Sequence, residues 1–102
     1  MATIVESTTD TVSNLNPGGS YVIGIAGTWD GMTATLKWSD GTNDVAFPSA
    51  GFQADAGLQF VSPTDIVKVV TGADATNAGS LTYSIAEVLD GKKNGASGFY
   101  VK

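Results

Sequence analysis

The sequence predicts a single domain built as an antiparallel β-sandwich, of the jelly-roll or immunoglobulin-like type. Three observations support this: thirteen glycines lie among threonine, valine and aromatic residues, turn signals recur at short intervals, and apolar residues alternate with polar ones between the turns. A chain of 102 residues is too short for two independent cores. We expect an N-terminal arm (1–19), a sandwich body (20–90) and a linker with a final strand (91–102).

The first residues have little apolar content. Residues 1–16 are polar and rich in threonine, with one short strand-like stretch at 3–5. Pro17-Gly18-Gly19 follows, and its composition predicts a hinge between an extended arm and the sheet. The segment shows neither the basic leader nor the apolar stretch of a signal peptide. The longest mostly apolar run, 21–29, is far below the roughly 20 residues that span a bilayer. We therefore expect no membrane segment.

Two alternating stretches flank the pair Asp30-Gly31. Their apolar members are Tyr21, Ile23, Ile25 and Trp29 on one side, and Met32, Ala34, Leu36 and Trp38 on the other. Asp-Gly is the preferred pair for a two-residue type I′ hairpin, because both central residues take positive φ. A tight hairpin sets Ile25 against Leu36 and Ile23 against Trp38. Since a slip of one residue would turn one apolar set toward water, the pattern favours this register.

The pair Asp40-Gly41 predicts a second hairpin of the same kind. It would place Leu36 opposite Val45, Ala34 opposite Phe47 and Lys37 opposite Asp44. The stretch 21–47 then forms a three-stranded meander with one buried face, and both tryptophans lie on that face. We favour core packing for the two indoles over an exposed, sugar-stacking platform, which would place its rings on the solvated side.

Metal binding by these turns is disfavoured. Asp30 and Asp40 lie at opposite ends of one predicted strand, roughly 30 Å apart at about 3.3 Å per residue, so they cannot share an ion. A local site at Asp40, Asn43 and Asp44 is conceivable, but it lacks the ligand spacing and the glycine position of an EF-hand.

Shorter strands follow. Residues 52–60 contain a turn at 55–57, and residues 65–72 are so rich in β-branched residues that we place them centrally or partly under a loop. Residues 72–80 form a polar loop in which Asp74 and Asn77 are expected to make turn hydrogen bonds. Residues 81–89 alternate as a strand, with a helix over 85–89 as the competing interpretation. Residues 99–101 end the chain as a strand that joins either its own sheet or a neighbour's.

The composition excludes much chemistry. Cysteine and histidine are absent, which removes disulfides, thiolate nucleophiles, the commonest general base and the usual zinc ligands. The sequence contains neither a phosphate-binding glycine loop with its lysine nor a serine in a nucleophile-elbow frame. Glu6 and Glu87 lie outside predicted turns, but nothing places them together as a glycosidase pair. We therefore expect no enzyme, no catalytic residue, no cofactor and no metal.

Charge is unevenly distributed. The formal net charge is −5 and all five cations are lysines, so a nucleic-acid partner, which needs a basic surface, is disfavoured. All ten acids precede Gly91, whereas the last segment is basic. Its candidate contacts with a partner are Lys92, Lys93, Phe99, Tyr100 and Lys102. A solvated charged end is the alternative interpretation.

The stretch 22–88 resembles a group of small β-rich proteins encoded among the virion genes of tailed phages. A Gly-Thr-aromatic strand, an alternating strand that ends in Ser-Asp-Gly, and a later Val-Val-x-Gly-Ala strand recur in that group. The matching positions here are Gly27, Thr28 and Trp29; Ala34, Thr35, Leu36, Trp38, Ser39, Asp40 and Gly41; and Val69, Val70, Gly72 and Ala73. This chain departs from the pattern after the Ser-Asp-Gly turn, where it has residues 42–44 instead of an early aromatic side chain.

The resemblance implies a capsid decoration (cement) protein that binds the head surface and bridges neighbouring capsid subunits. It also implies a homotrimer at three-fold positions, with the major capsid protein and other copies of the chain as partners. Such a protein is made in the host cytoplasm and resides on the virion surface. A carbohydrate-binding module and a tail, fibre or baseplate subunit are the alternatives.

Overall fold

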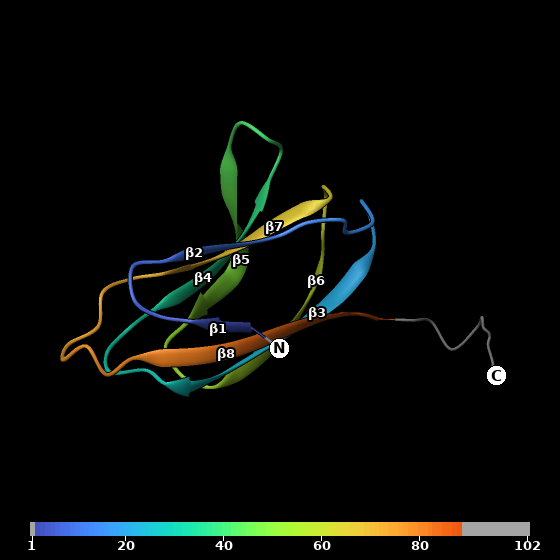
Figure 1. Cartoon of the computed structure of the whole chain (residues 1–102). Helices are drawn as coiled ribbons and strands as arrows, with labels where there is room; N and C mark the ends of the chain where they lie inside the picture. Colours follow the sequence, from blue (N-terminus) through green and yellow to red (C-terminus); the bar gives the residue numbers. More distant parts are fainter. Residues whose placement is uncertain (1, 89–102) are drawn as a thin grey trace.

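The computed structural model describes residues 2–88, apart from the side chain of Ser49. Two antiparallel sheets pack face to face, so the predicted β-sandwich is confirmed (Figure 1). The strands are β1 (Ala2–Ile4), β2 (Thr9–Val12), β3 (Ser20–Thr28), β4 (Ala34–Ser39), β5 (Asp44–Phe52), β6 (Ala56–Val61), β7 (Ile66–Thr71) and β8 (Ser80–Glu87). No helix in this part of the chain is long and apolar enough to cross a membrane.

The strand order is that of a jelly roll. The first sheet has the order β1-β8-β3-β6 and the second sheet has the order β2-β7-β4-β5. Every connection crosses from one sheet to the other except the β4–β5 hairpin. Two such four-stranded sheets make the eight-stranded jelly roll. In an immunoglobulin-like sandwich, by contrast, neighbouring strands along the chain often share a sheet, so the jelly roll is the architecture found here.

The crossings gather at the two ends of the sandwich. The connections β1–β2, β3–β4, β5–β6 and β7–β8 lie together at one end, which we call the turn end, because β3 is antiparallel to both β6 and β8. The opposite end holds the β2–β3, β4–β5 and β6–β7 connections.

The predicted hairpin between β3 and β4 is wrong, although its turn forms. Asp30 and Gly31 have φ of 48° and 78°, and the Met32 N–H donates to the Trp29 carbonyl over 2.7 Å. After this turn, however, β4 enters the other sheet, where Leu36 pairs with Val69. Alternation determines which side chains are buried, but it does so equally for strands lying side by side and for strands facing each other across a core.

The β4–β5 hairpin forms, but with a longer loop than predicted. Ser39 lies opposite Asp44 and Trp38 opposite Val45, so the expected pairs Lys37–Asp44 and Leu36–Val45 are wrong. The cause is the Asp40 carboxylate, which accepts hydrogen bonds from the Thr42 and Asn43 N–H groups at 2.8 and 2.7 Å. Such bonds build an Asx turn of four residues. The slip of two residues keeps the apolar side chains on the same face.

The partner of Ala34 on β5 also differs from the prediction. A β-bulge interrupts the β4–β5 ladder between Thr35 and Lys37, and beyond it Ala34 pairs with Phe52. The expected pairing of Ala34 with Phe47 is therefore wrong. Phe47 instead packs on Phe60 of the first sheet, with ring centroids 5.1 Å apart.

Residues 2–12 belong to the sandwich and do not form an arm outside it. β1 is an edge strand of the first sheet and β2 an edge strand of the second. Thr71 holds the turn between them, because its hydroxyl donates to the Val5 carbonyl over 2.6 Å and accepts from the Thr8 N–H over 3.0 Å. Edge strands bury only part of their surface, so a polar sequence can form them. For the same reason, these residues gave little apolar signal of a strand.

The expected hinge is bonded to the body. The Gly18 N–H donates to the Ser62 carbonyl over 2.7 Å, and the Ser62 N–H donates to the Gly19 carbonyl over 3.0 Å. In addition, the Asn16 N–H donates to the Tyr21 hydroxyl over 2.7 Å. The segment between β2 and β3 is therefore a fixed crossing between the two sheets.

The core lies between the sheets. β7 and β8 occupy central positions, which is one of the two places expected for 65–72, and β8 continues to Glu87 in place of the alternative helix. Both tryptophans are half-buried and pack against this core. Its buried apolar side chains are Ile4, Tyr21, Ile23, Ile25, Met32, Ala34, Leu36, Ala50, Phe52, Phe60, Val67, Val69, Leu81 and Tyr83.

At Gly27, β8 leaves no room for a side chain on β3. The φ of Gly27 is 144°, and a Cβ atom there would lie 2.4 Å from the Ser80 carbonyl oxygen. We expect Gly27→Ala to lower the free energy of unfolding by about 1–3 kcal/mol, because an L residue is strained in this conformation and the obstacle is backbone. Gly24→Ala, on the same strand with open space around it, should stay within about 0.5 kcal/mol. Urea denaturation of both variants tests this; equal midpoints would contradict it.

Candidate functional site

The residues expected to contact a partner lie outside the described part of the chain: Lys92, Lys93, Phe99, Tyr100 and Lys102. Within residues 2–88, three surfaces merit attention: the carboxylates of the turn end, a hollow beside them, and the outer face of the first sheet.

Asp30 ties two crossings together. Its carboxylate accepts hydrogen bonds from the N–H groups of Thr76 and Ala78 at 2.7 and 3.1 Å and from the Thr76 hydroxyl. Its own carbonyl accepts from the Ala75 N–H. These bonds, with the Thr76 N–H first, hold the pKa of Asp30 below its usual value. The carboxylate thus fastens the β3–β4 turn to the β7–β8 loop and serves structure.

Asp74 organises the same loop from within. Its carboxylate accepts from the N–H groups of Asn77 and Gly79 at 3.1 and 3.0 Å, as expected for a turn-forming residue. Its own N–H donates to the Glu6 carboxylate over 3.1 Å, which links the loop to the β1–β2 turn. Asn77 takes part in this turn through its backbone N–H.

Asp55 anchors the half-buried Trp29. One carboxylate oxygen accepts from the Trp29 indole Nε1–H over 2.8 Å and from the Gly27 N–H over 3.1 Å. These bonds, the indole first, lower the pKa of Asp55. Among residues 2–88, its other oxygen has no hydrogen-bond donor within reach. Asp55 therefore presents a fixed, ionised carboxylate at the turn end, with one oxygen engaged and the other open to a donor.

In the described range 2–88, no cluster of three or more Asp or Glu side chains could hold a metal ion. Asp10 accepts a hydrogen bond from the Tyr83 hydroxyl, which joins the second sheet to the first. Burial and this bond raise the pKa of Tyr83, so the phenol stays protonated and acts as a structural donor.

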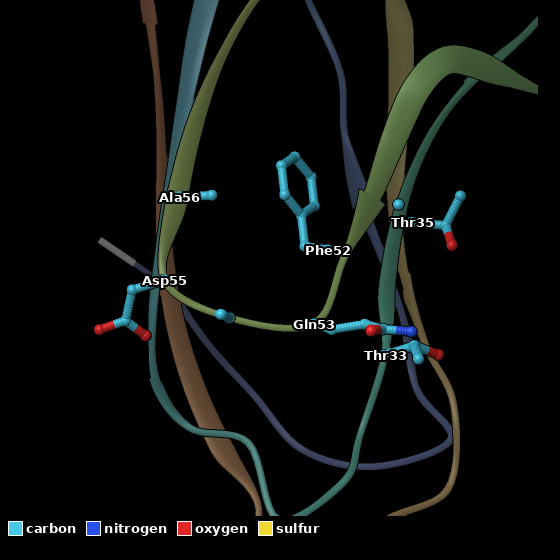
Figure 2. A pocket seen from close by; sticks show the side chains of 8 residues that line it. Thr33, Thr35, Phe52, Gln53, Asp55 and Ala56 are labelled. Carbon is cyan, nitrogen blue, oxygen red and sulfur yellow. The ribbon is translucent and has the colours of Figure 1, made fainter.

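A hollow of about 580 Å³ opens at the turn end (Figure 2). Phe52 stands between the two sheets, and Gln53 and Thr33 also line the hollow. The Asp55 carboxylate points away from Phe52 and Gln53 and out of the hollow. The lining includes no lysine, so the hollow offers no cation for an anionic ligand and no pair of facing acids.

The outer face of the first sheet carries no charge. Cross-strand pairing places the following outward-facing residues on its four strands: Thr3; Ser20, Val22, Gly24, Ala26 and Thr28; Gly57, Gln59 and Val61; and Ser80, Thr82, Ser84 and Ala86. We call this surface the uncharged face. The second sheet differs, because its outer side carries Lys37, Lys68 and Asp44, with Lys68 and Asp44 ion-paired at 3.2 Å.

The uncharged face has two parts. Near the opposite end, Val22, Val61 and Val88 are 40%, 55% and 38% exposed, which makes them three of the five large hydrophobic side chains exposed among residues 2–88. Toward the turn end lies a shallow depression of about 460 Å³, here called the small-residue hollow. Its lining is Gly24, Ile25, Ala26, Ala56, Thr82, Tyr83 and Ser84, together with Asp55, which belongs to the β5–β6 turn and not to a strand of the face.

Depletion of charged residues is a property that this face shares with the core of protein interfaces. Sequence reasoning missed the face, although a signal exists: residues 20–28 and 80–86 contain no Asp, Glu, Lys or Arg. The two segments had to be paired as β3 and β8 before their outward residues could be read as one surface.

Comparison with known proteins adds no relative: no family model, no curated protein and no solved structure matches the chain.

Acid should weaken the fold through its turn carboxylates. Hydrogen bonds lower the pKa of Asp30, Asp40 and Asp55, so their stabilisation is present above the ordinary aspartate pKa of about 3.9 and is lost as pH falls through the lower folded values. We expect Asp30→Asn to reduce stability at pH 7 and to flatten the decline below about pH 4. Urea midpoints across this range measure it.

Asp65→Asn is the matched control, since no side-chain bond of Asp65 occurs among residues 2–88. The two variants should differ in their acid dependence. Parallel pH curves would refute the role given to Asp30.

Proposed function

We propose that this chain is a virion structural protein of a tailed phage, a decoration (cement) protein that binds the head surface and bridges neighbouring capsid subunits. The observation that carries the proposal is the uncharged face, which spans four strands of a chain whose net charge is −5. The resemblance of residues 22–88 to small virion proteins supports the same function.

An uncharged surface costs little desolvation free energy when a partner covers it. Burying an ionised side chain requires a partner that replaces its water, whereas hydroxyl and small apolar groups lose far less on desolvation. At the turn end, by contrast, Asp30 and Asp74 are engaged in bonds to the backbone. The chain thus combines charged turns, which keep it in solution, with one face suited to lasting protein contact.

The last segment supplies the second set of contacts in this proposal. Lys92, Lys93 and Lys102 are the cations of residues 91–102, a stretch that contains no acid. They are suited to an acidic surface of the capsid protein or of another copy. Phe99 and Tyr100 add the apolar area that a stable contact needs.

The uncharged face can be tested by placing a charge on it. We expect the chain to co-sediment with heads of a phage that carries its gene, and Val22→Lys, on the exposed valine part of the face, to abolish co-sedimentation, because the new ammonium would lose its water on contact. Thr11→Lys, on the outer side of the second sheet, is the control and should still bind. Equal binding by the two variants would remove the face from the mechanism, and absence of the chain from purified virions would reject the proposal.

Removal of residues 91–102 tests the second set of contacts. The shortened chain should keep the circular dichroism signature of a folded β protein, because eight paired strands lie within residues 2–88. It should no longer bind heads. Unchanged binding would exclude the last segment from the interaction.

A further inference from the structure

We propose that the uncharged face is a docking site for the last segment, residues 92–102, of a neighbouring copy of this chain. An aromatic ring of that segment, Phe99 or Tyr100, would enter the small-residue hollow, and Lys102 would pair with Asp55. The inference rests on the proposed function and deepens it by naming a partner for the hollow, while the part of the face that carries the exposed Val22, Val61 and Val88 is left for the head.

The hollow suits a side chain that the face itself lacks. Gly24 has open space where a Cβ atom would stand, and Ala26, Thr82 and Ser84 around it are small, which leaves about 460 Å³. An aromatic ring fills such a depression with large apolar contact and few rotatable bonds. The outward positions of the four strands include no aromatic residue.

The Asp55 carboxylate beside the hollow favours a partner that carries a cation. Asp55 lines the hollow, with one carboxylate oxygen held by Trp29 and Gly27 and the other without a donor among residues 2–88. A fitting partner therefore places a cation close to an aromatic residue. In the sequence Phe99-Tyr100-Val101-Lys102, the lysine follows the aromatic pair by two or three residues, about 7–10 Å in an extended chain.

The area of the face favours a segment over the body of a second copy. Four strands about 4.8 Å apart and about seven residues long at 3.3 Å each give roughly 450 Å². A stable protein interface covers about 800 Å² on each partner. Two whole chains of net charge −5 would also repel each other, whereas residues 91–102 bring three lysines and no acid.

The course of β8 favours a neighbouring copy over the same chain. The Val88 N–H donates to the Ser20 carbonyl, so the chain leaves the sheet at the end away from the hollow. Its own last segment would have to reverse and run back across the strand it came from. A segment reaching the face of the next copy makes a head-to-tail contact, which closes into a ring when the rotation closes. A trimer is one such ring.

The test is a charge exchange read out by oligomeric state. Sedimentation of the full chain over a range of concentrations should show a closed oligomer. Asp55→Lys and Lys102→Glu should each raise its dissociation constant about tenfold or more, and the double variant should recover most of the loss. Asp65→Lys, a charge reversal at the opposite end, should leave association unchanged.

A second variant covers the risk that Asp55→Lys disturbs Trp29. Ser84→Lys leaves the Trp29–Asp55 bond intact and should also dissociate the oligomer. The indole N–H resonance of Trp29 then reports whether the turn end remains folded. A monomer at every concentration, or an oligomer insensitive to Lys102→Glu, would overturn the inference. So would a response of the Trp29 resonance to Lys102→Glu in dilute monomer, because the segment would then occupy its own face.

Head binding separates this inference from the proposed function. A monomeric chain that still co-sediments with heads would reject the docking site and leave the decoration function standing. An oligomer with the expected charge dependence that never binds heads would do the reverse.

Discussion

The crossing of the chain between two sheets at Asp30 is the constraint on which the rest of this structure depends. The Asp-Gly turn reverses the chain locally, and the bonds from Thr76 and Ala78 to the Asp30 carboxylate fix where the chain goes next. They hold the β3–β4 turn against the β7–β8 loop, so β4 pairs with β7 and β3 with β8. Without that tie, a simple meander would satisfy the same alternation.

The same crossings hold acidic residues, whereas the outward side of the first sheet has none on its strands. Asp30, Asp55 and Asp74 accept hydrogen bonds from backbone or indole N–H groups at the turn end. These acidic residues therefore lie in the connections between strands. The strands β3 and β8 can then carry Val, Ala, Ser, Thr and Gly on their outward side. An acidic protein thereby presents one face on which another chain can rest without burying charge, and this is the physical basis of the proposed decoration function.

The tryptophans illustrate how a residue can serve both packing and surface. Trp29 packs on the core with its body and offers its N–H to Asp55, as expected for an aromatic side chain with one apolar and one polar part. Trp38 lies between Val67, which is buried, and Val45, which is 41% exposed. Neither ring forms part of a free stacking platform, since both contact the core.

What the sequence determined by itself was local. Alternation and turn chemistry identified the β-sandwich, the buried side of β3 and β4, the positive-φ turn at Asp30-Gly31 and the central place of β7. The sequence could not determine strand partners, because alternation is the same for strands beside and opposite each other. The strand-like stretch at 3–5 was predicted, but β2 and the place of both strands in the sheets were missed, since polar edge strands carry little apolar signal. The uncharged face exists only once β3, β6 and β8 are paired, so only the tertiary structure could reveal it.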